Sequence, residues 1–273
     1  MKDIAPRKSL GQNFLKNKTV AMRIVDLLGD VSGKPVLEIG PGMGVLTEFL
    51  TERNPLLTLV ELDERAIDYL RNKFNRNLNI VHSDILDFDI KRHSEQYKEK
   101  LLVIGNIPYN ISTEIFFLLF ENAACISKAV LTVQKEVAVR VCSGYGSRQY
   151  GITSVAARLV CTPSIAFDIA AGSFFPAPKV TSSVLVLDFY QEHKYLNDFA
   201  EIMSLVRAAF SQRRKMLRNS LENYLKACNL PPKLLEDELN KNDLRYFSMR
   251  AEQLSLQDFV KLFEIISSLK KNK

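Results

Sequence analysis

The sequence predicts an α/β fold with a doubly wound sheet, followed by a smaller all-α region. From residue 35 to about 135, short apolar runs alternate with helical patterns, as they do where helices connect parallel strands. The first run ends in a glycine-rich turn, which is typical of the ligand-binding edge of such a sheet. From about residue 195 onward the pattern is helical only. We therefore expect an α/β domain over residues 1–190 and a helical domain over residues 191–273.

The composition is that of an ordinary globular protein with basic ends. The chain has 273 residues, of which 47% are hydrophobic, and a formal net charge of +6. Both residues 1–20 and residues 190–273 are net positive, which suggests a nucleic-acid partner, although a charge run can also be only a solvated face. The four cysteines have no metal-binding spacing, and neither a membrane span nor a signal peptide is evident. We expect a cytoplasmic, monomeric protein without a metal.

The glycine-rich turn follows the apolar run Val36–Ile39 and contains three glycines at alternate positions, Gly40, Gly42 and Gly44. Such a turn lets the backbone approach a ligand closely, and the helix after it offers free N–H groups. A dinucleotide fingerprint would need a glycine where the chain has Val45. Glu61 lies about 20 residues after Gly40, at the position where an acidic residue accepts hydrogen bonds from ribose hydroxyls. The pattern favours S-adenosylmethionine (SAM) over NAD; a purely structural turn is the alternative.

Another polar residue, Asp84, follows the apolar run Asn79–His82. In open α/β sheets, ligands lie at the carboxyl edge of the strands. Asp84 is therefore a candidate acceptor for an adenine amino group, and the alternative is that it caps a short helix.

The motif Asn106-Ile107-Pro108-Tyr109 after the fourth apolar run is the most specific feature. An exocyclic amine of a nucleobase is a poor nucleophile, because its lone pair is delocalised into the ring. Acceptors on its N–H groups, here the Asn106 side chain and the Ile107 carbonyl, would favour a pyramidal nitrogen. Pro108 has no N–H and keeps the preceding residue extended, and Tyr109 offers a face on which a flipped base can stack. The motif predicts methyl transfer to such an amine; an ordinary strand-to-helix turn is the alternative.

Three other segments contain candidate binding residues. Gln12 and Asn13 could contact a ligand or form a helix-capping turn. Arg148 lies in a glycine-rich loop that either holds an RNA backbone or is only a surface loop. Arginine forks suit phosphate geometry, and a basic run in the helical region is therefore expected to bind RNA: Arg213, Arg214, Lys215 and Arg218.

Several segments, in this order, resemble the ribosomal RNA adenine N6,N6-dimethyltransferase family: GQNFL, EIGPGMG, VELD, SDIL, NIPYNIS, QKEVA, SFFPAPKV and FSQRRK. The resemblance covers nearly the whole chain. It implies a seven-stranded, Rossmann-like, SAM-dependent methyltransferase sheet over residues 1–190, with a basic N-terminal arm. It also implies a small C-terminal all-α domain over residues 191–273 that recognises RNA.

The resemblance also implies the role of individual residues. It assigns contacts with SAM to Gln12, Asn13, Leu15, Gly40, Gly42, Glu61, Asp84 and Asn106. It places the target amine against Asn106, Pro108 and Tyr109, and it covers the base with Phe174, unless the neighbouring Phe175 takes that part. The family usually has leucine at the position of Ile107, where the contact is through the backbone carbonyl, so we expect isoleucine to serve.

The implied activity is dimethylation of two adjacent adenosines in the 3′-terminal hairpin loop of 16S rRNA, within the 30S subunit or its precursor. One alternative is the sister group that methylates an adenine of 23S rRNA and confers macrolide resistance. Another is an RNA-binding assembly factor with secondary catalysis.

Overall fold

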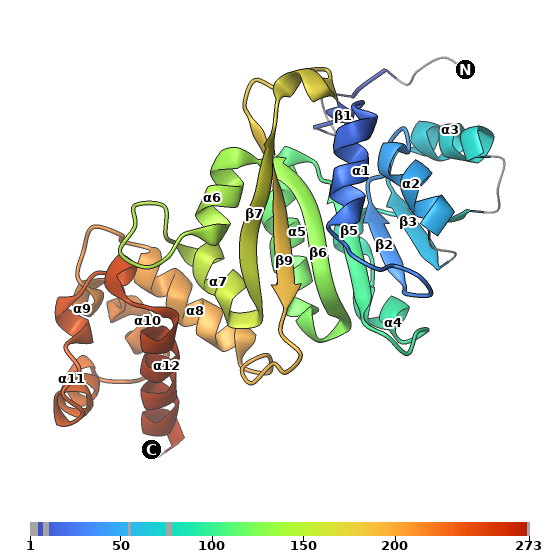
Figure 1. Cartoon of the computed structure of the whole chain (residues 1–273). Coiled ribbons are helices and arrows are strands. Elements are labelled where there is room, and N and C mark those ends of the chain that lie inside the picture. Colours follow the sequence, from blue (N-terminus) through green and yellow to red (C-terminus); the bar gives the residue numbers. More distant parts are fainter. Residues whose placement is uncertain (1–4, 8–10, 54–55, 75–77, 272–273) are drawn as a thin grey trace. The chain divides into compact units, whose positions relative to one another are not determined.

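The computed structural model describes the chain except for residues 1–4, 8–10, 54–55, 75–77 and 272–273. Part of the expected basic arm therefore lies outside the described residues. Figure 1 shows a sheet with helices packed against it and further helices toward the C-terminus. No helix among the described residues is long and apolar enough to cross a membrane.

The main sheet has seven strands, as expected, in the order β4-β3-β2-β5-β6-β9-β7. Their bounds are β2 (Val36–Ile39), β3 (Leu57–Glu61), β4 (Asn79–His82), β5 (Leu101–Asn106), β6 (Ile126–Gln134), β7 (Cys161–Ile169) and β9 (Ser182–Phe189). The first five strands in this order are parallel, and β9 runs antiparallel to both β6 and β7. The strand order reverses at β2, between β3 and β5, so the ligand crevice is expected at the carboxyl ends of these strands.

The sequence does not single out the edge strand β7. Most of its residues are exposed or half-buried, and it contains Pro163, so it has no apolar run to mark it. A second, two-stranded sheet pairs β1 (Phe14–Leu15) with β8 (Phe174–Phe175). This pairing joins the N-terminal segment to a segment far along the chain.

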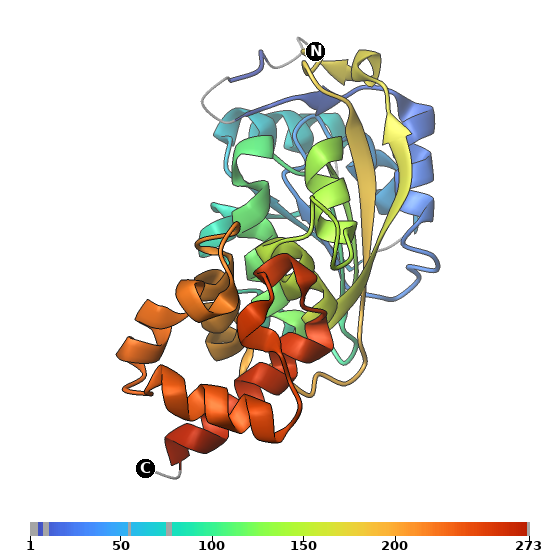
Figure 2. The same cartoon turned by 90° about the vertical axis from the view of Figure 1, so that its left-hand side faces the viewer.

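The helices follow the local signals closely. The Asn17 side chain accepts a hydrogen bond from the Val20 N–H at 3.1 Å and caps α1, and Pro232 stands in the first turn of α11. The helix bounds are α1 (Lys18–Asp26), α2 (Val45–Arg53), α3 (Glu64–Phe74), α4 (Ile90–Ser94), α5 (Ser112–Glu121), α6 (Lys135–Cys142), α7 (Ile152–Val160), α8 (Phe199–Phe210), α9 (Leu217–Ser220), α10 (Glu222–Ala227), α11 (Pro232–Lys241) and α12 (Leu256–Lys271). Figures 1 and 2 show α1 and α5 on opposite faces of the sheet.

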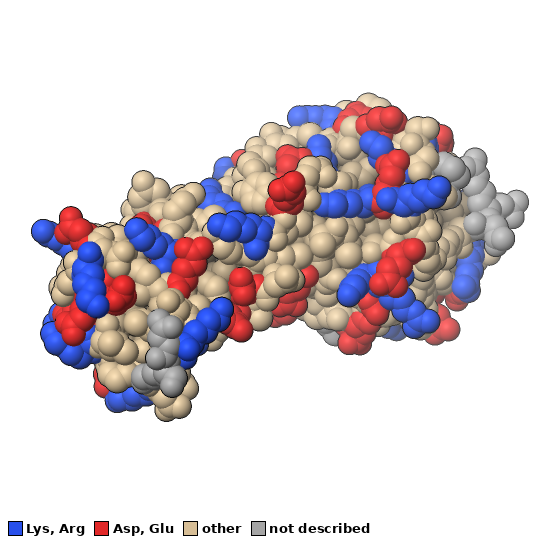
Figure 3. Space-filling view, turned by 90° about the horizontal axis from the view of Figure 1, so that it is seen from below, with Lys and Arg blue, Asp and Glu red and all other residues tan. Residues whose placement is uncertain are grey.

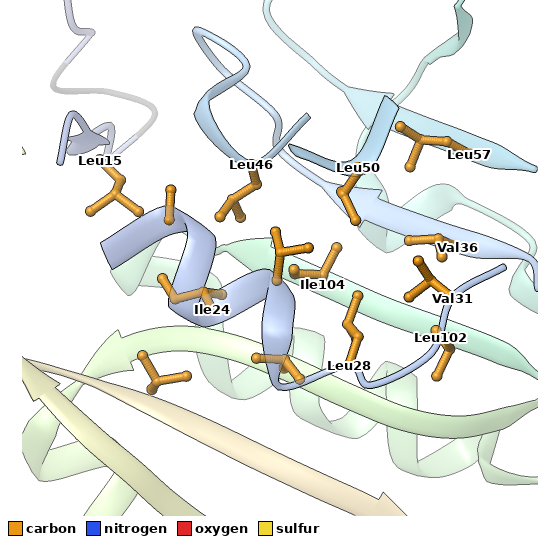
Figure 4. Close-up of a cluster of buried hydrophobic side chains, with 14 of the residues drawn as sticks. Leu15, Ile24, Leu28, Val31, Val36, Leu46, Leu50, Leu57, Leu102 and Ile104 are labelled. Atoms are coloured by element: carbon orange, nitrogen blue, oxygen red, sulfur yellow. The ribbon is translucent and has the colours of Figure 1, made fainter. Parts of the chain in front are cut away.

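A large apolar cluster lies between α1, α2 and the central strands (Figure 4). The cluster includes Ile24 and Leu28 of the α1 region, Val36 of β2 and Ile104 of β5, and each of these side chains is buried. Full burial of such a side chain stabilises the fold by roughly 1.5–3 kcal/mol. The cluster therefore holds the strands whose ends carry the candidate site.

The chain divides into two compact units. The first comprises residues up to Val139 together with Val160–His193, and the second comprises Arg140–Leu159 together with Lys194–Lys273. The second unit has its own aromatic core, in which Phe210 stacks on Phe259 at 6.0 Å between ring centroids and Tyr150 meets Phe210 edge-on at 5.9 Å. The expected boundary near residue 190 thus lies close to one junction, while residues 140–159 group with the C-terminal helices because Tyr150 packs among them.

Candidate active site

The turn after β2 requires its glycines. Gly40, Gly42 and Gly44 all have positive φ angles, of 62°, 57° and 70°, which side chains disfavour. A Cβ atom on Gly42 would also lie only 2.9 Å from the ring of Phe14. The turn therefore has no side chains at these three positions, and its backbone can lie close to a ligand bound at the end of β2.

Glu61, at the end of β3, is held by backbone donors. Its Oε1 accepts hydrogen bonds from the N–H groups of Leu62 at 2.9 Å and Asp63 at 2.8 Å, and its Oε2 accepts one from the N–H of Gly42 at 3.0 Å. Burial raises the pKa of Glu61, and these three donors oppose that shift. A carboxylate offers about four acceptor sites, so one site, on Oε2, stays available for a ribose hydroxyl.

Asp84 caps a short helix, which is one of the two interpretations that the sequence left open, and its role as an acceptor for an adenine amino group stays a prediction. Its Oδ1 accepts a hydrogen bond from the Leu86 N–H at 2.9 Å and so caps the short helix Ile85–Asp87. The same residue lines the cavity described below. The cap fixes the carboxylate at the edge of the sheet.

At the end of β5, the orientation of Asn106 follows from a single contact. Its Nδ2 donates a hydrogen bond to the backbone carbonyl of Asn13 at 2.7 Å. Because a carbonyl can only accept, the amide nitrogen must face Asn13, which leaves Oδ1 as an acceptor for another group. Tyr109 is fixed as well, since its hydroxyl lies 2.5 Å from the Oγ of the buried Ser182. Burial raises the pKa of the Tyr109 phenol.

The N-terminal segment contributes directly to the site. Gln12 and Asn13 do not cap α1, because Asn17 has that role. The Gln12 Nε2 instead donates to the carboxylate of Asp63 at 3.0 Å, and the Asn13 carbonyl accepts from Asn106. The capping turn is therefore not the role of this pair, and contact with a ligand stays a prediction.

These elements enclose a cavity of about 250 Å³ at the carboxyl edge of the strands. It is lined by most of the residues expected from the sequence, namely Gln12, Asn13, Gly40, Gly42, Glu61, Asp84, Asn106, Pro108 and Tyr109. Leu15 is buried and borders a smaller adjoining recess together with Gly40 and Asn106.

Phe174 is not brought to the cavity. Its side chain is 1% exposed and belongs to the apolar cluster that also contains Leu15, whereas the neighbouring Phe175 is 51% exposed. Successive residues of a strand point to opposite sides, so burying one ring exposes the other. A base could stack on Phe174 only if that ring left the cluster.

Two acidic residues near the site did not emerge from sequence reasoning. Glu38 lies inside β2, is 1% exposed and accepts a hydrogen bond from the Thr47 hydroxyl at 2.8 Å. Burial raises its pKa to about 8. Asp63 follows β3 and is also buried. An acid within an apolar run, or directly after one, is the signal that marks both.

The five expected RNA-binding residues all belong to the second compact unit. Arg213 pairs with Glu252 at 2.9 Å and donates to the Arg148 carbonyl, while Arg218 pairs with Glu236 at 2.6 Å. Arg214 and Lys215 are exposed, and no ion pair involves them within the described part of the chain. On the face shown in Figure 3, basic and acidic side chains are intermingled and form no continuous basic patch. Arg148 is exposed as well, and only its backbone carbonyl takes part in the contact with Arg213. Among the described residues, the side chains of Arg148, Arg214 and Lys215 are therefore the charges of this group without an ion pair.

The donor set of the cavity fits SAM. Glu61 offers a fixed carboxylate oxygen to a ribose hydroxyl, and Ile39, Val60 and Ile85 supply apolar walls for an adenine ring. Asp84 offers an acceptor for an amino group at the same edge. The doubly wound sheet, the glycine turn and this cavity together define the class of SAM-dependent methyltransferases.

Within that class, the chain belongs to the ribosomal RNA adenine dimethylase family, whose sequence model matches residues 5–267. It is therefore an enzyme of the rRNA adenine dimethyltransferase type, with SAM as its cofactor.

Relatives and solved structures agree with this assignment. The chain is 40% identical to the ribosomal RNA small subunit methyltransferase A of Parabacteroides distasonis, over 96% of this chain and 94% of that protein. It is 38% identical to the protein of the same name in Cytophaga hutchinsonii, over 98% of this chain and 99% of that protein. A crystal structure of a dimethyladenosine transferase from Plasmodium falciparum matches with a TM-score of 0.79 and 25% identity, covering 93% of this chain and 98% of that one. The structure of the 23S rRNA methyltransferase ErmE matches with a TM-score of 0.67 and 25% identity, covering 93% of this chain and all of that one.

Proposed function

We propose that this enzyme dimethylates the N6 atoms of two adjacent adenosines in the 3′-terminal hairpin loop of 16S rRNA. The substrate is the 30S subunit or its precursor, and the enzyme acts as a monomer in the cytoplasm. Full-length similarity to proteins named ribosomal RNA small subunit methyltransferase A supports the choice of RNA. The N6-amine as the acceptor is supported by one observation above all, the fixed orientation of Asn106.

The residues after β5 can prepare an adenine amine for attack. With its nitrogen bound to Asn13, Asn106 presents Oδ1 as an acceptor for one N–H of the amine. The Ile107 carbonyl accepts from the other, and Pro108 offers no competing donor. When bound, SAM supplies a methyl group on a sulfonium, which is a strong electrophile. Positioning therefore does most of the work, and no strong general base is needed.

Tyr109 and the basic residues hold the RNA. The Tyr109 ring lines the cavity with its hydroxyl anchored, so it offers a fixed face to a flipped base. The other side of the base is covered by Phe175, whose ring is exposed, or by Phe174 once that ring has left the apolar cluster. Arg148, Arg214 and Lys215 contact phosphates of the RNA. Arg213 and Arg218, which are held in ion pairs with Glu252 and Glu236, flank them in the chain. The helical region over residues 191–273 selects the RNA, and the α/β region over residues 1–190 performs the chemistry.

The decisive experiment compares two RNAs and two variants. The enzyme is incubated with tritiated SAM and unmethylated 30S or 50S subunits, and primer extension locates the modified adenines. We expect two adjacent modified adenosines in 30S subunits and none in 50S subunits. Asn106→Ala should lower methylation by at least about 100-fold, whereas Asn122→Ala, a matched change at the end of α5, should leave it within about twofold. Full activity of Asn106→Ala would overturn the proposal.

The 23S-specific alternative is kept because the structure of ErmE has the same fold over its entire length. Methylation of 50S RNA in the same experiment would favour it. The assembly-factor alternative predicts that Asn106→Ala protein, although inactive, still supports small-subunit maturation fully.

A further inference from the structure

Asp63 is a buried carboxylate that the chemistry proposed above does not use. It follows Glu61 by two residues, its side chain is 0% exposed, and it does not line the cofactor cavity. Arg65 donates to it through Nη2 at 2.6 Å and through Nε at 2.9 Å. The Arg65 guanidinium holds the pKa of Asp63 down at about 2, so this group is ionised throughout the neutral range.

The other partners of Asp63 and Arg65 come from the N-terminal segment. Gln12 donates from Nε2 to Asp63 Oδ2 at 3.0 Å, and the Arg7 Nη1 lies 4.0 Å from Asp63 Oδ1. Arg65 also donates from Nη1 to the Ala5 carbonyl at 3.2 Å. Gln12 is further fixed because its Oε1 accepts the N–H of Arg7 at 2.8 Å. The ion pair between the buried Asp63 and the half-buried Arg65 thus contacts three separate residues of this segment.

The same segment reaches the end of β5. The Asn13 carbonyl accepts from the Asn106 side chain, and Gly11 lies so close to Asn110 that a Cβ on it would be 2.3 Å from the Asn110 Oδ1. Residues 11–14, which we call the strap, all line the cofactor cavity. The strap therefore spans the cavity from the end of β3, where Asp63 holds it, to the end of β5, where it orients Asn106.

We propose that Asp63 is a positioning residue: through Gln12 it holds the strap across the cavity, so that SAM is retained and Asn106 is oriented before the adenine arrives. This inference rests on the proposed function for the role of Asn106. The expected effect of Asp63 on SAM binding does not depend on which RNA is methylated.

The hydrogen bond from Gln12 to Asp63 is strong enough to change the affinity for SAM measurably. A hydrogen bond to a charged group is worth about 1.5–3 kcal/mol, which corresponds to about a 10- to 100-fold change in affinity. Asp63→Asn removes the charge and leaves the shape of the side chain nearly unchanged. We expect it to weaken SAM binding by about tenfold or more.

Two substitutions at Gln12 distinguish the positioning of the strap by Asp63 from a direct electrostatic attraction between SAM and the site. Gln12→Lys keeps a donor facing Asp63, whereas Gln12→Glu places two carboxylates against each other. SAM carries a net positive charge, so its direct attraction to the site would make the glutamate variant bind more tightly. The strap mechanism predicts the opposite order, with Gln12→Glu weaker than Gln12→Lys by about tenfold or more.

The experiment is isothermal titration calorimetry of SAM with the full chain in the absence of RNA. The matched control is Asp26→Asn, which removes an exposed ion pair with Arg53 and should leave binding unchanged. The difference between the two Gln12 variants should vanish when Asp63→Asn is added, because Asp63 acts through Gln12.

Two results would overturn the inference: wild-type affinity in Asp63→Asn, or Gln12→Glu binding at least as tightly as Gln12→Lys. Should Asp63→Asn fail to fold, the Gln12 pair alone decides, since Gln12 is only half-buried. No RNA is present in this titration. A negative result for Asp63 would therefore not affect the proposed RNA substrate, and a wrong RNA substrate would not affect the measured SAM affinities.

Discussion

Glu38 provides the sharpest test of the energetics of this fold. It lies in the centre of β2, fully buried among apolar side chains, with the Thr47 hydroxyl as its hydrogen-bond donor. Burial disfavours the charged form and raises its pKa from 4.5 to about 8. The folded state therefore keeps a proton on Glu38 at neutral pH, whereas the unfolded chain releases it.

The sign of the pH dependence follows from this difference. Between about pH 4.5 and pH 8 the folded state binds more protons than the unfolded state at Glu38, so stability falls as the pH rises through that window. Glu38→Gln cannot ionise, and its amide oxygen can still accept from Thr47. Relative to this variant, the wild-type protein should lose about 2.5 kcal/mol of unfolding free energy between pH 5 and pH 7.

Urea unfolding measures this difference. The chain contains no tryptophan, so far-UV circular dichroism is the suitable signal. Other titrating groups are shared by the two proteins and cancel in the comparison. Glu48→Gln is the control, because the hydrogen bond from Lys18 lowers the pKa of Glu48 below its usual 4.5. Glu48 is therefore ionised in both states above about pH 5, and the stability difference between this variant and wild type should stay nearly constant from pH 5 to pH 7. Parallel stability curves for wild type and Glu38→Gln over this range would show that Glu38 is not held protonated, and the reasoning would fail.

Three further outcomes are expected. Glu61→Gln must turn its amide nitrogen toward at least one backbone donor, so SAM binding should weaken by about 10- to 100-fold in calorimetry, and unchanged affinity would contradict the role of this carboxylate. Replacing Arg214 and Lys215 by alanine together should reduce the slope of log affinity for rRNA against log salt by about one to two units in filter binding, and an unchanged slope would remove them from the RNA interface. Gly105→Ala places a Cβ 2.7 Å from the Ile39 carbonyl and should cost about 1–3 kcal/mol in thermal unfolding, whereas Gly144→Ala, which meets nothing within 4 Å, should not; equal effects would refute the close approach of β2 and β5.

Local patterns account for most of the agreement between sequence and structure. The runs Val36–Ile39 and Asn79–His82, which the sequence analysis singles out, form the strands β2 and β4 with these same bounds. The residues that mark each run lie within a few positions of one another, so this signal needs no tertiary contact. The strand β7 carries no such signal, because it is an antiparallel edge strand that buries few of its side chains.

The candidate site likewise combines features that local sequence patterns predict and contacts that they do not predict. The sequence alone determined the glycine turn, Glu61, Asp84 and the motif at Asn106, because each follows an apolar run whose end must lie at one edge of a parallel sheet. Only the tertiary structure decided that Asn13 orients Asn106 across 93 residues of chain and that Asp63 holds Gln12 across 51. It also decided that Phe174 is buried while Phe175 is exposed. Residue spacing specifies which groups share a local element, but contacts between distant segments exist only once packing has brought those elements together.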